Sequence, residues 1–336
     1  MQYSTFGRTG ISVSRLILGT WYLPHTQTMD MKGLFPVDRQ EASRVIRKAL
    51  DLGINFFDTA DVYRGVYNRR EKGDLSMVGN SERVLGEALK GEERDSFVVS
   101  TKFMGRTGPG PNDAGLSRKH VRSAIEKSLE RLGLDYVDIY LLHGPDEVTG
   151  PEISIRSMND LISRGHILHF GASNHSPVQL EELYTAADRK SLEEPVAVQE
   201  IFNLVNRSFE GDMFRTVNRH GGASMIYSPL AQGLLAGRYS GAAGPVSRKE
   251  YEQNFDPGKA GVTEQQMTQF SDFAVAKSAS MAQMALAWLL AKGKQIFPIV
   301  GASSVEQLEE NVGACSIRLS ESDMAELETI FGSKQS

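Results

Sequence analysis

Four ionisable residues stand at or just beyond the ends of apolar runs in the first half of the sequence. Asp58 closes the run in GINFFDTADVY, and Tyr63 follows in the same stretch. Lys102 closes the run in VVSTKF, and His143 closes the run in LLHGPD. An ammonium beside a tyrosine stabilises the phenolate, and a carboxylate can orient that ammonium by an ion pair. With a histidine to polarise a carbonyl oxygen, this set could protonate that oxygen while a hydride reaches the carbon.

Each of the four residues also has a purely structural interpretation. Asp58 could be a satisfied buried carboxylate, Lys102 a lysine with a packed stem, His143 a hydrogen-bonded structural histidine, and Tyr63 a packing aromatic. Taken one at a time, the structural interpretation is favoured. Taken together on one rim of a fold, the four residues favour the chemical interpretation.

Eight short apolar runs recur along the chain and would position these residues. They are Arg15–Gly19, Ile54–Phe57, Phe97–Thr101, Val137–Leu142, Ile167–Gly171, Val196–Gln199, Met225–Tyr227 and Ile296–Val300. Each run is too short for a typical helix, and most are rich in Val, Ile or Phe. Their nearly continuous apolar character is typical of strands that are covered on both faces.

The segments between the runs carry helix signals. Asp38 and Glu41 predict an N-terminal cap with a reciprocating glutamate, and Ser303 and Glu306 repeat that spacing near the end of the chain. The first helix is expected to end at a capping Gly53, and a further helix is expected between Ser117 and Gly133.

Alternating strands and helices predict parallel βαβ units, and eight units suggest one α/β domain over residues 1–336, a (β/α)8 TIM barrel. A doubly wound sheet is the alternative, but no GxGxxG motif follows the first run. An N-terminal β-hairpin is expected over residues 1–14, turning in FGRTG. Long rim loops are expected at Tyr22–Val37, Arg64–Gly79 and Ser240–Val262, and the glycines and prolines of the last predict mobility.

The composition excludes several classes of protein. The chain has 336 residues and a formal charge of −5, which argues against a basic surface for nucleic acid. Cys315 is the only cysteine, so an internal disulfide is impossible and a cysteine-based metal site is disfavoured. No run of 18 apolar residues exists, and the N-terminus does not read as a signal peptide. A cytoplasmic protein is expected, and homo-oligomerisation is left open.

The sequence resembles the aldo-keto reductase family over nearly its whole length. The matching stretches, in the family's order, are GINFFDTADVY, VVSTKF, DYVDIYLLHGPD, GASNHS, VQEIFNL, YSPLAQGLLAGRY and GASSVEQLEENVGA. The last two are most similar to the branch that holds potassium-channel β-subunits and related bacterial aldehyde reductases. The resemblance implies a barrel that binds NADPH without a Rossmann motif. It also implies a catalytic tetrad of Asp58, Tyr63, Lys102 and His143, with Tyr63 as the proton donor.

The resemblance also implies a set of cofactor-binding residues. Ser173, Asn174 and Gln199 would hold the nicotinamide carboxamide, Tyr227 would stack on its ring, and Thr20, Trp21 and Asp58 would lie nearby. Ser228, Pro229, Leu230, Ala231 and Gln232 would form the loop at the pyrophosphate, with Arg238 as a cation near phosphate. Gly301, Ser303, Gln307, Glu310 and Asn311 would form the adenosine site. A helix beginning near Ser303 would favour the adenosine 2′-phosphate at its N-terminus.

The expected function is NADPH-dependent reduction of aldehydes or ketones to alcohols, without a metal. Positions 301–305 hold no carboxylate, and Glu306 is expected to lie further into the helix. Because positions 301–307 also lack lysine and arginine, the preference over NADH is expected to be only about tenfold to a hundredfold, or about 1.4 to 2.7 kcal/mol. The long loop after Tyr63 departs from the family pattern, as does Phe202, where many members have tyrosine. The substrate therefore does not carry over.

Two other classes of protein remain as alternatives. An NADPH-binding regulatory or scaffold subunit with low turnover would suit the β-subunit resemblance, although the complete tetrad argues against it. A metal-dependent barrel hydrolase would need several histidines and carboxylates at strand ends, and only His143 among the seven histidines ends a run.

Overall fold

Eight parallel strands close into a barrel in the computed structural model, which describes residues 1–26, 36–65, 75–237 and 261–332. Around the barrel the order is β10, β3, β4, β5, β6, β7, β8 and β9. The strands are β3 (Ile17–Gly19), β4 (Phe56–Asp58), β5 (Val98–Phe103), β6 (Val137–Leu142), β7 (Ile167–Ser173), β8 (Ala197–Ile201), β9 (Ala223–Tyr227) and β10 (Ile296–Val300). The predicted (β/α)8 barrel is confirmed, and the doubly wound sheet is wrong.

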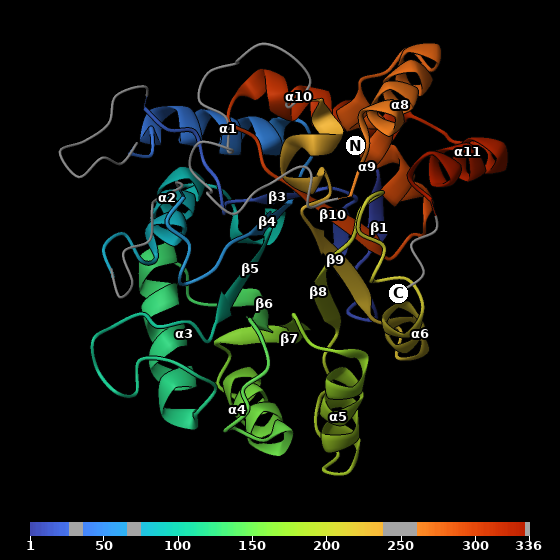
Figure 1. The fold of residues 1–336 in the computed structure, drawn as a ribbon. Coiled ribbons are helices and arrows are strands. Elements are labelled where there is room, and N and C mark those ends of the chain that lie inside the picture. Colours follow the sequence, from blue (N-terminus) through green and yellow to red (C-terminus); the bar gives the residue numbers. More distant parts are fainter. Residues whose placement is uncertain (27–35, 66–74, 238–260, 333–336) are drawn as a thin grey trace.

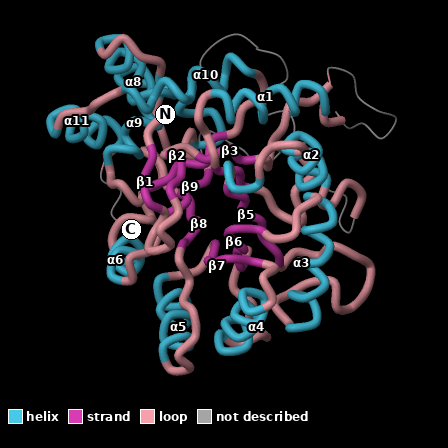
Figure 2. Tube along the Cα trace, turned by 180° about the vertical axis from the view of Figure 1, so that it is seen from behind, coloured by secondary structure: helices cyan, strands magenta, loops and turns pink. Residues whose placement is uncertain are grey.

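Helices surround this barrel on the outside, as Figures 1 and 2 show. The α-helices are α1 (Arg39–Asp51), α2 (Asn80–Leu89), α3 (Arg118–Leu132), α4 (Pro151–Ser163), α5 (Pro177–Asp188), α6 (Asp212–Arg219), α8 (Glu264–Ala276), α9 (Met281–Ala291), α10 (Val305–Gly313) and α11 (Glu321–Phe331). Short 3-10 helices are η1 (Arg94–Ser96), η2 (Ala231–Ala236) and η4 (Ala314–Ser316). Most of the buried apolar side chains lie between the strands and this helical layer, which explains the continuous apolar runs.

The expected strand boundaries hold for β6 and β10 and shift slightly elsewhere. β3 begins at Ile17 rather than at Arg15, because the Arg15 backbone N–H donates to the Gln2 carbonyl and not to a barrel strand. β4 includes Asp58 and β5 includes Lys102. Both charged residues therefore belong to the strands and do not merely follow them.

An antiparallel hairpin precedes the barrel, as expected. Its strands are β1 (Tyr3–Thr5) and β2 (Ser12–Ser14). Phe6, directly after β1, is fully buried, with its ring centroid 5.3 Å from those of both Phe56 and Phe297 inside the barrel. Burying such a ring stabilises the fold by about 1.5–3 kcal/mol. Because Phe6 packs on Phe56 and Phe297, the hairpin closes the end of the barrel opposite the strands' carboxyl ends.

The helix ends follow the cap signals with two corrections. Ser117 caps α3, and Gly133 ends it in the left-handed region at φ 65°. Asp38 caps α1, but its own N–H donates to the Pro24 carbonyl, so the predicted reciprocal bond from Glu41 is wrong. α10 begins after Ser304, one residue later than expected, because the Ser304 hydroxyl accepts from the Gln307 backbone N–H. The N–H and hydroxyl of Ser303 donate to the Gln307 side chain instead.

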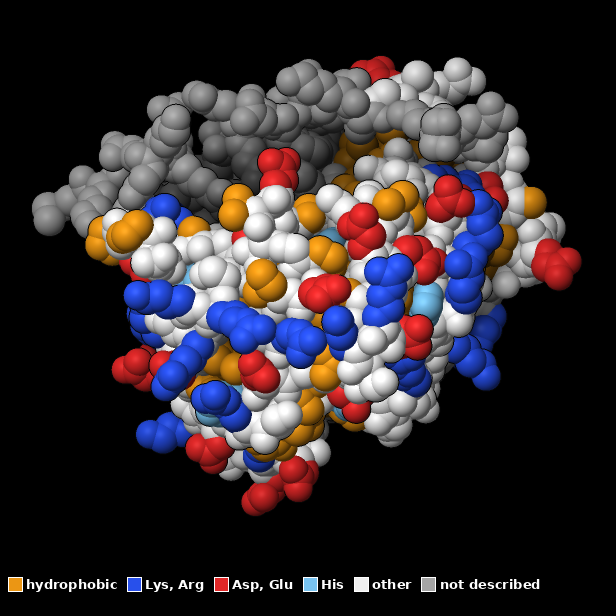
Figure 3. Space-filling model, turned by 90° about the horizontal axis from the view of Figure 1, so that it is seen from below, with side chains coloured by type: hydrophobic (Ala, Val, Ile, Leu, Met, Phe, Trp, Pro, Cys, Tyr) orange, Lys and Arg blue, Asp and Glu red, His pale blue; other side chains and the backbone are white. Residues whose placement is uncertain are grey.

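The long loops predicted around the rim lie partly outside the described residues. In and next to these loops, the positions outside the described residues are 27–35, 66–74 and 238–260. The mobility predicted for Ser240–Val262 concerns mostly the last of these ranges. In the described part, no single helix is long and apolar enough to span a membrane; α8 and α9 reach that length only as a pair, which is bent by 84°. Figure 3 shows a face on which basic side chains form a band with acidic ones among them.

Candidate active site

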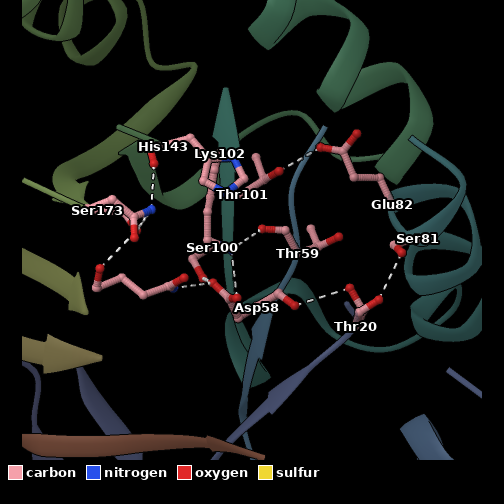
Figure 4. Close-up of polar contacts among 12 residues, drawn as sticks. Thr20, Asp58, Thr59, Ser81, Glu82, Ser100, Thr101, Lys102, His143 and Ser173 are labelled. Carbon is pink, nitrogen blue, oxygen red and sulfur yellow. Dashed lines mark hydrogen bonds and ion pairs between the residues drawn. The ribbon is translucent and has the colours of Figure 1, made fainter. Parts of the chain in front are cut away.

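The four residues singled out from the sequence converge at the carboxyl rim of the barrel. The Lys102 Nζ lies 2.7 Å from the Asp58 Oδ2, and both side chains are almost completely buried (Figure 4). The same Nζ lies 4.5 Å from the centroid of the Tyr63 ring, and the Tyr63 ring centroid is 5.8 Å from that of His143. Neighbouring parallel strands place their last residues together, so β4, β5 and β6 deliver this group jointly.

Asp58 is the most heavily hydrogen-bonded member of the group. Its Oδ1 accepts from the Ser100 hydroxyl at 2.7 Å and from the Gln199 Nε2 at 2.9 Å, while Oδ2 faces Lys102. Lys102 also donates to the Thr59 carbonyl at 2.6 Å. A buried ion pair needs such extra hydrogen bonds to offset its loss of hydration. The ammonium is therefore held in one place beneath the Tyr63 ring.

Burial and charge act in opposite directions on the two titrating groups of the site. For Lys102, burial would lower the pKa, but the Asp58 and Tyr63 partners outweigh it, and the pKa is raised. For Tyr63, burial raises the pKa, the Lys102 charge lowers it and the Asp58 charge raises it again, with a net increase. Lysine alone would make the phenol more acidic, as expected from the sequence. In the folded protein burial dominates, and Tyr63 holds its proton at neutral pH.

The remaining neighbours fix the position of Tyr63 and His143. The Trp21 ring, 40% exposed, meets the Tyr63 ring edge-on at a centroid distance of 4.7 Å. The His143 backbone N–H donates to the Phe103 carbonyl, and the His143 carbonyl accepts from the Asn174 Nδ2 at 2.9 Å. Both residues are thus tied to the ends of neighbouring strands, and Tyr63 is only 8% exposed.

The residues expected around the nicotinamide lie together at the ends of β7, β8 and β9. The Ser173 hydroxyl donates to the Gln199 carbonyl at 2.8 Å and accepts from the Asn174 Nδ2 at 3.1 Å. The Tyr227 hydroxyl donates to the Asn174 Oδ1 at 2.9 Å. Thr20 is buried after β3, and its hydroxyl donates to the Asp58 carbonyl at 3.1 Å. The barrel brings all of these residues next to the tetrad.

The loop expected at the pyrophosphate follows β9 and has an unusual backbone. Ser228, Ala231 and Gln232 all have positive φ, between 46° and 59°. Pro229 and Leu230 complete the turn, and the Leu230 carbonyl accepts from the Gly233 N–H at 2.9 Å. Within the described residues, the backbone N–H groups of Ser228 and Leu230 have no acceptor. They are therefore available to an anion.

The residues expected at the adenosine lie between β10 and α10. Gly301 is exposed, and a Cβ added there would meet no atom of the described residues within 4 Å. Asn311 is buried, and its Nδ2 donates to the Gly301 carbonyl at 3.3 Å, while Glu310 is exposed. Glu306 stands in the first turn of α10 and not further into the helix, which corrects the expectation. Hydrogen bonds from its own backbone N–H and from Ser304 lower the pKa of its carboxyl.

This donor set fits a nicotinamide dinucleotide. Its parts lie at strand ends on one rim. They are the polar cluster around Asn174, the two backbone donors after β9 and the open space before α10. Arg238, the expected cation, lies outside the described residues. Among the residues that the structure describes, no group of three or more His, Cys, Asp or Glu side chains could hold a metal ion.

The sequence reasoning missed three residues that border the site. Ser100 and the Thr59 carbonyl bind the Asp58–Lys102 pair, and Glu200 accepts a hydrogen bond from the His175 backbone N–H at 3.0 Å. The period of two along a strand could have pointed to Ser100, because it shares a face of β5 with Lys102. No local signal pointed to the other two.

Comparison with known proteins agrees with this architecture. A model of the aldo/keto reductase family matches residues 15–331. The chain is 33% identical over 325 residues to a probable voltage-gated potassium channel subunit beta of Arabidopsis thaliana, covering 94% of this chain and 92% of that protein. It is 32% identical over 343 residues to the L-glyceraldehyde 3-phosphate reductase of Escherichia coli O157:H7, covering 98% of this chain and 92% of that protein. The chain therefore belongs to the aldo/keto reductase family, whose members are oxidoreductases that typically use NAD(P)H.

Proposed function

We propose that this protein is an NADPH-dependent reductase that converts aldehydes or ketones to alcohols, with Tyr63 as the proton donor. The observation that carries the proposal is the buried Lys102–Asp58 pair, 2.7 Å apart, directly beneath the Tyr63 ring. The family membership supports the reaction class.

The roles of the residues follow from their charges and positions. A bound reduced nicotinamide supplies a hydride to the carbonyl carbon. Tyr63, whose pKa is raised by burial, carries its proton at neutral pH and donates it to the carbonyl oxygen. Lys102 stabilises the phenolate that remains, and Asp58 keeps Lys102 charged and in place. His143 hydrogen-bonds the same oxygen and orients the carbonyl.

The cofactor preference follows from the N-terminus of α10. The dipole of α10 favours the 2′-phosphate of NADPH at the N-terminus of the helix. The Glu306 carboxylate in the same turn opposes it, so we place the preference over NADH near the lower expected value, about tenfold or 1.4 kcal/mol. Dissociation constants for both cofactors, measured by protein fluorescence at one ionic strength, test this. Equal constants, or tighter NADH, would contradict it.

The substrate is a small carbonyl compound, and a panel of substrates would identify its class. NADPH oxidation is measured with short aldehydes, dicarbonyls, sugar aldehydes, aromatic aldehydes and a small phosphorylated aldehyde. The last is included because of the name of the Escherichia coli relative. The loop after Tyr63 is expected to shape this preference, although positions 66–74 of it lie outside the described residues.

A single-atom change tests the proton donor. Tyr63→Phe removes the hydroxyl and keeps the ring that packs against Trp21, so turnover should fall by about two to four orders of magnitude while NADPH still binds. Tyr136→Phe is the matched control, because Tyr136 packs beneath Arg94 before β6, away from the rim. Normal turnover in the Tyr63 variant would reject the assignment. If NADPH binds but no carbonyl compound is reduced, the regulatory subunit is favoured instead.

A further inference from the structure

Glu200 stands at the rim but has no part in the proposed reaction as described so far. It follows Gln199 on β8, and Gln199 points into the barrel, where its Nε2 meets Asp58. Successive side chains of a strand point to opposite faces, so Glu200 points out of the barrel. There its Oε1 accepts from the His175 backbone N–H at 3.0 Å, just beyond the end of β7.

The turn that Glu200 binds holds a residue with a left-handed backbone conformation. Asn174, directly before His175, has φ 59°, in the left-handed region that asparagine adopts more readily than most non-glycine residues. In this conformation its side chain reaches two proposed site residues, donating to the His143 carbonyl and accepting from the Tyr227 hydroxyl, both at 2.9 Å. The contacts around the turn select this conformation over the alternatives open to an asparagine. The bond from His175 to Glu200 is one such contact.

The surroundings of Glu200 leave its charge sensitive to pH. Burial raises the pKa of Glu200 to about 7, although the His175 and Asn174 N–H groups act to lower it. Of the titratable groups facing it, Tyr227 on β9 has a pKa raised to about 12 by burial and then by the charge of Glu200. The His175 ring has its pKa lowered by burial, and its Nδ1 lies 2.8 Å from the Ser173 carbonyl. Within the described residues, no charged side chain contributes to the shift of Glu200.

We propose that Glu200 is a positioning residue, which holds the Asn174–His175 turn by its backbone hydrogen bond and through Asn174 sets the places of His143 and Tyr227. This inference rests on the proposed carbonyl reduction for its functional consequence. The structural part, from Glu200 to the turn, stands on geometry alone. A carboxylate accepts hydrogen bonds more strongly than a neutral carboxyl, so the turn is held most firmly when Glu200 is ionised.

The first test measures the turn itself, without cofactor or substrate. Glu200→Ala removes the acceptor, and Glu200→Gln keeps an acceptor oxygen without the charge. Backbone hydrogen exchange over residues 171–177 should speed up about tenfold in the alanine variant, the equivalent of one lost buried hydrogen bond, and by less than about threefold in the glutamine variant.

The matched control for this test is Asp138→Asn. Asp138 is also a buried carboxylate that accepts from a backbone N–H, that of Val99 at 2.8 Å, but it lies near the start of β6, at the other end of the barrel. Its replacement should leave exchange over residues 171–177 unchanged. Unchanged exchange in Glu200→Ala would overturn the proposal, as would equal acceleration in all three variants.

The second test measures the functional consequence. In Glu200→Ala, the dissociation constant for NADPH should rise about threefold to tenfold, and kcat/KM should fall about tenfold, because Tyr227 and His143 both lose a fixed partner. Glu200→Gln should recover most of both losses. In the wild-type protein kcat/KM should show a rise centred near pH 7 that Glu200→Gln lacks.

The outcomes separate this inference from the proposed function. Losses of the same size in both Glu200 variants, or an identical pH profile in wild type and Glu200→Gln, would overturn the positioning role. If the wild-type protein reduces no carbonyl compound, the proposed function fails. The exchange and NADPH-binding measurements still test the positioning role of Glu200 in that case, because neither measurement needs turnover.

Discussion

Replacing Asp58 with asparagine should destabilise the protein strongly, although the two side chains have the same shape. The asparagine keeps an oxygen for Ser100 and Gln199, but it removes the charge opposite Lys102, whose side chain is 0% exposed. An amide NH2 in place of Oδ2 would also face the ammonium, donor against donor. Removing one partner of a buried ion pair usually costs about 3–5 kcal/mol, and we expect a loss of this size.

The double variant shows whether the loss comes from the pair. Lys102→Met leaves the Asp58 carboxylate buried without its cation and should cost a similar amount. Replacing both partners removes both uncompensated charges, and substitution of a buried pair by apolar groups is often neutral or stabilising. Asp58→Asn with Lys102→Met should therefore be more stable than either single variant, with a coupling energy of about 3 kcal/mol or more between the two sites.

The pH dependence gives an independent check with a definite sign. In the wild type, the raised pKa of Lys102 means that its stabilisation is complete below the ordinary lysine value of 10.5 and is lost as pH rises through the folded-state pKa. In Asp58→Asn, burial prevails and the pKa of Lys102 falls below 10.5, so the unfolded state binds the proton more tightly and stability rises with pH. The deficit of the variant should therefore shrink between pH 7 and pH 10.

Urea unfolding followed by tryptophan fluorescence measures all four proteins. Trp288 is fully buried and Trp21 is 40% exposed, so unfolding should change the emission clearly. Midpoints are compared only where the slope against urea is the same. Additive losses in the double variant, or a loss below about 1 kcal/mol for Asp58→Asn at pH 7, would refute the reasoning that the buried charges depend on each other.

Three further predictions concern stability. Relative to Glu200→Gln, the wild-type protein should lose about 3 kcal/mol of stability as pH rises from about 4.5 to about 7, because the folded state holds the Glu200 proton more tightly than the unfolded state; parallel urea titrations of the two proteins would contradict it. Asp61 is fully buried, and its oxygens have no side-chain hydrogen-bond partner among the described residues. Burial and then the charge of Glu82 raise its pKa well above the usual range, although Arg131 and the Val62 N–H act to lower it. Asp61→Asn should therefore be at least as stable as wild type at pH 7, and a loss above about 2 kcal/mol would show that the carboxylate is ionised. Gly86→Ala should cost about 1–3 kcal/mol, because its Cβ would collide with the Leu132 carbonyl where α2 meets α3; a normal melting temperature would mean that the helices can shift apart.

The sequence by itself determined the barrel and the rim on which the site lies. Eight β-rich runs alternating with capped helices allow few other arrangements, and parallel strands bring their carboxyl ends to one edge. A polar residue at the end of each run therefore had to face the same rim. Asp58, Lys102 and His143 could be grouped on this ground alone, before any distance between them was known.

Only the tertiary structure decided how these residues act on one another. Gln199 reaches Asp58 across 141 positions of sequence, and Glu200 reaches the turn after β7, because barrel closure and the alternation of side chains bring them there. The net pKa of Tyr63 was equally beyond the sequence, since the Lys102 charge favours one direction and burial favours the other. Local patterns specify which groups are present, whereas the balance between desolvation and charge depends on how many neighbours exclude water, and that number is a property of the folded chain.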